Sequence, residues 1–247
     1  MTNMTVSAYT EKADALFREW KLSSGTIQYT VKGKTETQII DHANSVFIRD
    51  GVVCPDQWFS QSIRPLFLLK EAPRWENDCD LIKDHLTKNY DIHKMWQRIS
   101  FWTKGLFETT PDYLMPFESR SPDTLCYGNE HLKKIAVINV RKSDCENSSD
   151  IKIIEAYGEF DKSRLRKQLE LCDPTIIVCG YTASVLDSIM GYPVRKNENQ
   201  NLYYYIKLNN HDVLVLDYWH PANRYPDLMN YYGLMGIYQS ALRNKDN

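Results

Sequence analysis

The sequence predicts an α/β protein whose central sheet is mainly parallel and is covered by helices on both faces. Three short apolar runs carry this prediction, over residues 65–69, 135–140 and 175–179. None of them alternates between apolar and polar residues, which is typical of a strand buried on both faces. Helical patterns lie between the runs, and strands that alternate with helices indicate parallel pairing.

Local patterns predict the elements that precede the first of these strands. Residues 6–22 repeat apolar side chains at helical spacing, so we expect an amphipathic helix to open the chain. A polar, glycine-containing stretch follows to about Thr35, and we assign it no regular structure. Residues 54–59 indicate a loop that opens a short helix and leads into the first strand.

Four further helices and one strand pair are expected in the rest of the chain. Apolar periodicity predicts the helices over residues 80–107, about 151–172, 182–190 and about 227–243. The first of these segments fits one long helix or two shorter ones equally well. Residues 202–207 and 212–217 are expected to pair as strands through the turn at Asn209 and Asn210.

The chain of 247 residues is expected to form a single domain, with residues 1–60 as an N-terminal helical and loop extension packed on it. The formal net charge of −2 argues against a protein that coats nucleic acid or a membrane through bulk charge. A local basic groove stays compatible with that charge. The six cysteines form no C-x-x-C pair and have no histidine at zinc-ligand spacing, so we expect no metal site.

The same sequence gives expectations about compartment and surface. The N-terminus does not resemble a signal peptide, and no apolar run approaches the ~20 residues that a membrane helix needs. We therefore expect a monomeric cytoplasmic protein with reduced cysteines and no membrane partner. Aromatic residues make up 12% of the chain, and we expect most of them in the core and some in a stacking surface for a planar ligand.

Polar side chains follow three of the predicted strands at their carboxyl ends, where parallel sheets bind ligands. They are Glu71, Asn139 and His220. A carboxylate, an amide and an imidazole suit a reaction in which a planar heterocycle leaves a sugar. The amide reads the edge of the ring, the imidazole binds an oxygen that gains negative charge, and the carboxylate positions water or stabilises the positive sugar. The same groups would also serve other hydrolyses.

Four motifs resemble those of the uracil-DNA glycosylase superfamily and occur in the same order. They are LLKEAP at 68–73, INVRK at 138–142, TIIVCG at 175–180 and HPA at 220–222. Each motif is short, so the resemblance depends on the ordered set, which extends from about Pro65 to the C-terminus. It implies a three-layer α/β/α sandwich that flips a base out of nucleic acid and hydrolyses its N-glycosidic bond without a cofactor.

The resemblance also implies roles for individual residues. Glu71 would orient or activate water, Asn139 would hydrogen-bond the edge of the base, and His220 would stabilise the charge that develops on the leaving base. The implied activity is that of a metal-independent DNA glycosylase, acting in base-excision repair or in defence against foreign DNA. The implied partner is single- or double-stranded DNA with a flipped base.

Several positions depart from the motifs of that superfamily. Lys70 and Arg74 stand where the first motif has glycines, so long cationic side chains occupy positions that normally let the backbone approach the substrate. Ala222 replaces a serine whose hydroxyl would hold a phosphate or cap the last helix. A different base, a modified base and a lost activity are all consistent with these changes.

Other residues near the three motif residues are assigned supporting roles. Trp75 lies just beyond Glu71 and is our candidate for stacking on a flipped base. The candidates for phosphate or rim contacts are Lys70, Arg74, Arg141, Asn223 and Arg224. For Lys142 we favour a solvated position at the end of its strand.

Two other functions are weighed against the glycosylase. A non-catalytic binding module would use the same pocket to recognise a modified base or nucleotide, and the altered first motif favours it. A hydrolase of free nucleosides or nucleotides would suit the mild acidity of the chain and its lack of a basic run. Such a hydrolase would show no salt-dependent affinity for DNA.

Overall fold

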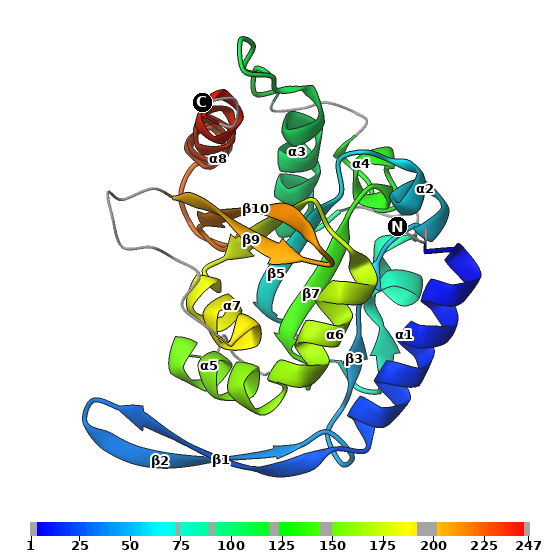
Figure 1. The fold of residues 1–247 in the computed structure, drawn as a ribbon, viewed down its shortest axis with the longest axis vertical. Coiled ribbons are helices and arrows are strands. Elements are labelled where there is room, and N and C mark those ends of the chain that lie inside the picture. Colours follow the sequence, from blue (N-terminus) through cyan, green and yellow to red (C-terminus); the bar gives the residue numbers. More distant parts are fainter. Residues whose placement is uncertain are drawn as a thin grey trace.

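The computed structural model describes residues 4–72, 75–88, 92–118, 124–143, 150–191 and 202–244. Its centre is a six-stranded sheet in the order β4-β7-β5-β8-β10-β9 (Figure 1). The inner strands, which are parallel to one another, are β7 (Ala136–Arg141), β5 (Pro65–Glu71), β8 (Ile176–Gly180) and β10 (His211–Tyr218). The edge strands β4 (Gly51–Val52) and β9 (Tyr203–Leu208) are antiparallel to their neighbours. The prediction of a mainly parallel sheet is confirmed.

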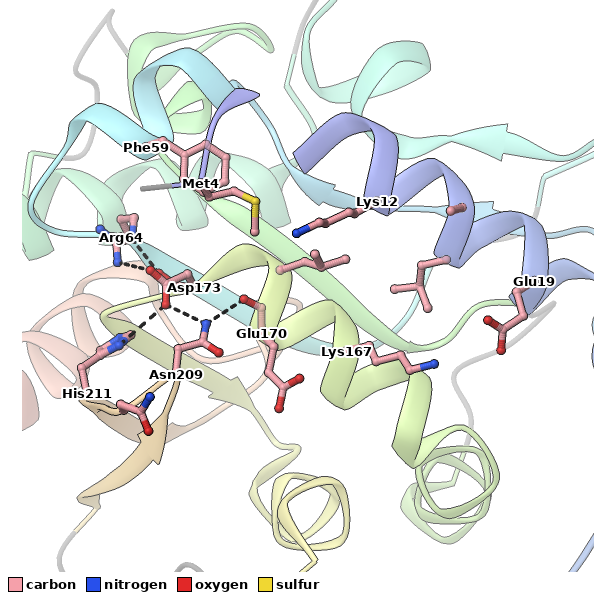
Figure 2. Close-up of a pocket in the computed structure, with 14 residues that line it drawn as sticks. Met4, Lys12, Glu19, Phe59, Arg64, Lys167, Glu170, Asp173, Asn209 and His211 are labelled. Atoms are coloured by element: carbon pink, nitrogen blue, oxygen red, sulfur yellow. Dashed lines mark hydrogen bonds and ion pairs between the residues drawn. The ribbon is translucent and has the colours of Figure 1, made fainter. Parts of the chain in front are cut away.

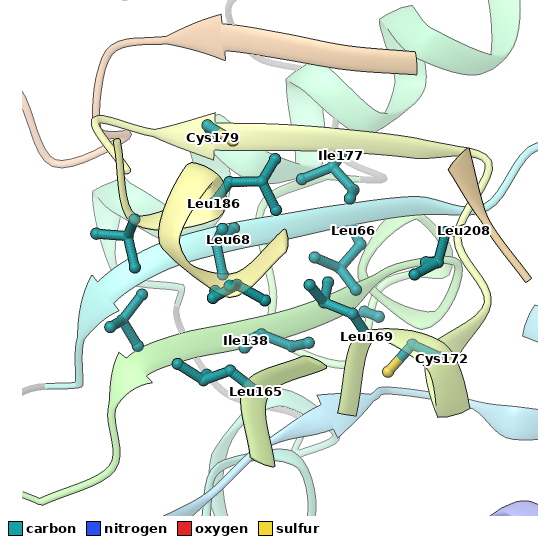
Figure 3. Close-up of a cluster of buried hydrophobic side chains, with 14 of the residues drawn as sticks. Leu66, Leu68, Ile138, Leu165, Leu169, Cys172, Ile177, Cys179, Leu186 and Leu208 are labelled. Atoms are coloured by element: carbon teal, nitrogen blue, oxygen red, sulfur yellow. The ribbon is translucent and has the colours of Figure 1, made fainter. Parts of the chain in front are cut away.

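Helices pack on both faces of this sheet. One layer consists of α1 (Val6–Lys21), α5 (Ile151–Phe160), α6 (Lys162–Cys172) and α7 (Ala183–Met190). The other layer is built mainly from α3 (Lys94–Glu108) and α8 (Asp227–Arg243). We call the two sides of the sheet the α6 face and the α3 face. Figure 3 shows the packing on the α6 face, where Leu165 and Leu169 of α6 lie against the sheet.

The inner strands are apolar because both of their faces are buried. Leu66 and Leu68 of β5 belong to the core on the α6 face, whereas Phe67 and Leu69 belong to the core on the α3 face. Alternate side chains of one strand therefore enter two separate cores. This burial explains why continuous apolar runs predicted these strands.

The connections place a topological switch point at the carboxyl end of the sheet. β5 is followed by α3 on one face, and its neighbour β8 is followed by α7 on the other face. Adjacent parallel strands whose connections leave toward opposite faces are separated by a crevice at their carboxyl ends, and ligands bind there in open α/β sheets. In this protein the switch point lies between the ends of β5 and β8, at Glu71 and Gly180.

The first 60 residues contain more regular structure than the predicted helical and loop extension. A hairpin of β1 (Ser24–Val31) and β2 (Lys34–Asp41) follows α1, and β4 belongs to the central sheet. Residues 24–31 alternate only between exposed and half-buried positions. Because the hairpin has no deeply buried face over that strand, it lacks the apolar signal that predicts strands elsewhere. The short elements here are β3 (Ile48–Arg49) and α2 (Pro55–Ser60), the latter as predicted.

Two of the predicted helical segments are divided. The segment over 151–172 breaks at Asp161, whose buried carboxylate lies 2.8 Å from His42 Nε2 and accepts a hydrogen bond from Arg164. The segment over 80–107 separates into a π-helical turn, η1 (Ile82–Leu86), and α3. The two-helix alternative is therefore the correct one. The remaining short elements are β6 (Cys79–Asp80) and α4 (Glu130–Lys133).

Three further observations concern the described ranges. None of their helices is both long and apolar enough to cross a membrane. Their cysteines are free thiols, namely Cys54, Cys79, Cys126, Cys172 and Cys179. They contain no group of three or more histidine, cysteine, aspartate or glutamate side chains placed to hold a metal ion.

Candidate active site

The ends of the parallel strands bring the predicted site residues to one edge of the sheet. Glu71 ends β5, and Asn139 lies near the end of β7. His220 follows β10 by two residues. Parallel strands that start at one edge must end at the other, so these residues share the carboxyl edge.

Glu71 and Asn139 also share the α3 face. Asn139 is in register with Leu69, and residues paired between neighbouring strands point to the same side of the sheet. Leu69 belongs to the core on the α3 face, and Glu71 is two residues further along β5. Because strand side chains repeat with a period of two, the backbone directs all three residues to this face.

His220 lies against the same part of the sheet. A Cβ atom added to Gly180 would be 2.8 Å from Leu69 Cδ2 and 3.5 Å from His220 Cδ2. Gly180 therefore leaves the space in which the imidazole of His220 approaches Leu69. Asn139 and His220 thus flank Leu69 from the β7 side and the β8 side. All three predicted motif residues therefore belong to the carboxyl edge of the sheet, with the backbone of Glu71 and Asn139 directed to the α3 face.

The environment of His220 keeps its imidazole neutral. Burial, with a smaller effect from the positive charge of Lys70, lowers the pKa of His220 to about 4. His220 Nδ1 accepts a hydrogen bond of 3.2 Å from the backbone N–H of Ala222. A neutral imidazole that accepts at Nδ1 carries its proton on Nε2. His220 therefore presents an N–H donor from Nε2.

We expect the imidazole of His220 to titrate near pH 4, well below the ordinary value of about 6.5. The unfolded chain takes up this proton at a higher pH than the folded chain, so His220 contributes to a loss of stability as pH falls from about 6.5 towards 4. NMR titration of the histidine Cε1–H signals measures the pKa, and the signal that disappears in His220→Ala identifies the residue. A midpoint above pH 6 would contradict the buried environment described here.

Arg98 holds the loop that carries His220. Its buried guanidinium donates hydrogen bonds to the carbonyl oxygens of Pro221, Asn223 and Tyr225, at 2.5, 3.0 and 3.2 Å. It also donates from Nε to Asp227 Oδ1 at 2.9 Å. One side chain of α3 thereby fixes residues 221–227. No local sequence pattern reveals Arg98, because most of its partners are backbone atoms of residues 221–225, which are distant in the sequence.

Asn223 and Arg224, two of the candidate rim residues, differ in their surroundings. The Asn223 amide donates to the backbone oxygen of His220 at 2.8 Å and to Asn230 Oδ1 at 2.6 Å. Its own Oδ1 accepts the backbone N–H of Tyr225 at 2.9 Å. These bonds give Asn223 a structural role in shaping the loop. Arg224 is exposed on the same loop.

Asp50 connects Asn139 to a buried polar cluster that the sequence did not predict. Asp50 Oδ2 accepts the backbone N–H of Asn139 at 2.8 Å and its side-chain Nδ2–H at 3.1 Å. Asp50 Oδ1 accepts from Lys142 Nζ at 2.5 Å and from Gln168 Nε2 at 2.8 Å. We call Asp50, Asn139, Lys142 and Gln168 the Asp50 cluster. All four residues are buried.

The expectation that Lys142 is solvated is wrong. Its side chain has no exposed surface, and its ammonium lies 5.0 Å from the ring centre of Trp20 and 5.8 Å from that of Phe17. Burial lowers the pKa of Lys142, and the neighbouring Asp50 carboxylate opposes this shift. The side chain continues the α6-face alternation of β7 and is covered by α1. A position at a strand end does not reveal this cover, which comes from residues more than 100 positions earlier.

The other candidate residues differ in their surroundings. Lys70 is half-buried and lies close enough to His220 to affect its pKa. Arg141 donates from Nε to Ser143 Oγ at 3.1 Å, and its guanidinium lies 4.9 Å from the ring centre of Tyr157. Trp75 is half-buried, with its ring edge-on to His85 at 5.7 Å. Arg74 lies outside the described residues.

Exposed aromatic residues adjoin His220 and Gly180 along the chain, and no sequence pattern distinguishes them from the other aromatic residues. Trp219 and Tyr225 have exposed fractions of 39% and 52%, and their ring centres are 4.6 Å apart. Tyr181 is 59% exposed and has a φ of 62°, and its backbone N–H donates to the oxygen of Tyr218. We call Tyr181, Trp219 and Tyr225 the aromatic patch. It continues the candidate site outward onto the surface.

A pocket of about 830 Å³ lies at the opposite edge of the sheet (Figure 2). None of the predicted site residues lines it. Its polar groups largely bond one another, since Asp173 accepts from Arg64 at 2.8 Å and from Asn209 at 2.8 Å. These bonds hold Asp173 in the left-handed conformation that ends α6. We therefore assign this network a structural role and place the candidate chemistry at the carboxyl edge.

A scan against models of known protein families finds no match to the chain, and a search of curated proteins finds no relative. The likeness to the uracil-DNA glycosylase superfamily thus depends on the four ordered motifs of the sequence. The geometry of the carboxyl edge provides an independent basis for a functional proposal.

Proposed function

We propose that the protein is a DNA glycosylase-like hydrolase, which flips a base out of a DNA strand and hydrolyses its N-glycosidic bond. The observation that carries this proposal is that Glu71, Asn139 and His220 all belong to the carboxyl edge of the parallel sheet, with the backbone of Glu71 and Asn139 directed to the α3 face and His220 close to Gly180. Each of these three side chains supplies one chemical group that hydrolysis of the N-glycosidic bond requires. The four ordered sequence motifs support the same activity.

In the proposed reaction, the bond between the sugar C1′ and the base breaks as water adds to C1′. The base leaves with the bonding electron pair, and the Nε2–H of His220 would donate a hydrogen bond to the base oxygen that takes up the negative charge. The neutral imidazole can make this hydrogen bond because its proton is on Nε2, while Nδ1 accepts from Ala222. The Glu71 carboxylate would accept the proton of the attacking water and stabilise the positive charge on the sugar.

The aromatic patch supports a single strand as the preferred substrate. Unpaired bases stack on exposed aromatic rings, whereas bases inside a duplex have no free face for such contacts. Tyr225 belongs to the segment that Arg98 fixes, and its ring lies 4.6 Å from that of Trp219, so little ordering of Tyr225 is needed when a strand binds. Because the net charge is −2, stacking would contribute more to affinity than bulk electrostatics.

Replacing Trp219 or Tyr225 with alanine should weaken binding of a fluorescein-labelled single-stranded oligothymidine by about tenfold, since one stacked base contributes about 1–3 kcal/mol. Fluorescence anisotropy measures the affinity. Tyr113→Ala is the matched control, because Tyr113 is also exposed but lies in another part of the surface. The neighbouring Thr110 and Pro111 accept hydrogen bonds from Gln239 and Arg243, in the C-terminal half of α8. Equal losses in all three variants, or tighter binding of the duplex, would exclude the single-strand preference.

A base-release assay tests the proposed function directly. Single-stranded and duplex oligonucleotides that carry uracil and other damaged or modified bases are incubated with the protein, and alkali then cleaves each abasic site. We expect strand cleavage with at least one base. Retention of an oligonucleotide without cleavage would instead indicate a binding module, and turnover of free nucleosides alone would indicate a small-molecule hydrolase.

A further inference from the structure

The orientation of the Asn139 amide is set by Asp50. The same carboxylate oxygen of Asp50 accepts both the backbone N–H and the side-chain Nδ2–H of Asn139. If the amide were turned by half a revolution, Asn139 Oδ1 would face this carboxylate. Two acceptors would then meet in a buried place without a proton between them, which is costly. Asp50 therefore allows one orientation of the amide.

The rest of the Asp50 cluster keeps the carboxylate in place. Lys142 and Gln168 both donate to the second oxygen, Oδ1, so Asp50 cannot rotate away without breaking these bonds. The Lys142 ammonium also forms a buried ion pair with this carboxylate. Asp50 has no exposed side-chain surface, so water does not compete for its lone pairs. The acceptor that faces Asn139 is thus fixed in position.

A fixed amide distinguishes bases by the order of donor and acceptor along their edge. An amide that reads a base presents an oxygen acceptor and an N–H donor side by side. A uracil-type edge offers an N–H beside a carbonyl, and a cytosine-type edge offers a ring nitrogen acceptor beside an amino group. Changing from one to the other requires the amide to turn over, which Asp50 prevents.

We propose that Asp50 is a positioning residue that fixes the donor–acceptor polarity of the base selected by Asn139. This inference rests on the proposed function, because it takes Asn139 as the residue that reads the base. The ligand class is a nucleobase in a single strand, and the wild-type protein accepts one of the two polarities and disfavours the other. Asp50 acts through Asn139 and touches no substrate atom.

The test compares affinities for two oligonucleotides that differ only in one base, uracil or cytosine. Glu71→Gln is the common background, so that binding is measured without turnover. Into it we introduce the pair Asp50→Asn and Lys142→Met, which removes both charges together and leaves an amide that can either accept or donate. The matched control is Gln168→Met, which loses a bond to Asp50 but leaves its contact with Asn139.

We expect the uracil-to-cytosine affinity ratio to move towards one by about tenfold or more in the double variant, since a good bidentate contact discriminates by about that factor. The uracil-to-cytosine affinity ratio of the Gln168→Met variant should stay within about twofold of that of the Glu71→Gln background. If Asp50 had a purely structural role, the double variant would bind both oligonucleotides more weakly by the same factor, and the affinity ratio would stay unchanged. If the double variant does not fold, Asp50→Glu provides the comparison, because it keeps the charge but displaces the carboxylate.

Two outcomes would overturn the inference. The first is an unchanged uracil-to-cytosine affinity ratio in both the double variant and Asp50→Glu. The second is equal binding of the two oligonucleotides by the Glu71→Gln background protein. Failure of the proposed function looks different. In that case the wild type releases no base from either oligonucleotide, while the affinity ratio still depends on Asp50.

Discussion

Glu71→Gln should lower the rate of base release by about 10²- to 10⁴-fold, the usual contribution of a general base. Glutamine has nearly the shape of glutamate, and it would occupy the same place at the end of β5. It cannot accept a proton from water, and it carries no negative charge to oppose the positive sugar. Single-turnover release of the base from an oligonucleotide, with enzyme in excess, measures the chemical step without product release.

Glu76→Gln is the matched control for this experiment. Glu76 is an exposed carboxylate five residues further along the chain, and its replacement removes the same charge. We expect its rate to stay within about twofold of the wild type, because exposed substitutions away from the site are nearly neutral. Unchanged base release in Glu71→Gln would show that Glu71 is not the catalytic carboxylate.

Lys142→Met should lower the free energy of unfolding by about 3–5 kcal/mol. Methionine fills a similar volume between Trp20 and Phe17, so lost packing is not the main effect. The variant leaves the Asp50 carboxylate buried with Asn139 and Gln168 as hydrogen-bond donors but without a countercharge. Unfolding in urea, followed by circular dichroism, gives the difference in free energy.

Adding Asp50→Asn to Lys142→Met should restore most of this stability. Removing both charges of a buried pair is often neutral, whereas removing one leaves the other uncompensated. The two single variants and the double variant therefore form a cycle with a large coupling free energy. A loss below about 1 kcal/mol in Lys142→Met is the size expected of an exposed ion pair and would contradict the buried pair.

The accuracy of the fold prediction depended on how deeply each element is buried. β5, β7 and β8 were predicted from apolar runs, and both faces of these strands lie in the two cores. The helix over Asp227–Arg243 was also predicted, with the observed bounds. The hairpin at 24–41 was not predicted, because its side chains are mostly exposed or half-buried and its strands are stabilised mainly by pairing with each other. Local sequence patterns do not reveal pairing between strands.

Breaks within helices depended on distant residues. The sequence over 151–172 has the periodicity of one continuous helix. The helix is interrupted at Asp161. The buried carboxylate of Asp161 contacts His42, which lies 119 residues earlier in the chain. A buried polar pair of this kind is formed only in the folded chain, so the periodicity of either segment does not reveal it.

The sequence by itself determined the inner strands of the central sheet, most of the helices, and the positions of Glu71, Asn139 and His220 at strand ends. These features follow from local periodicity and from the rule that parallel strands share their carboxyl edge. The tertiary structure decided the environment of each group, including the neutral imidazole of His220, the buried Lys142 and the carboxylate that orients Asn139. The physical reason is that desolvation and hydrogen bonding depend on which distant segments cover a side chain. Burial of this kind is a property of the assembled layers and not of any one segment.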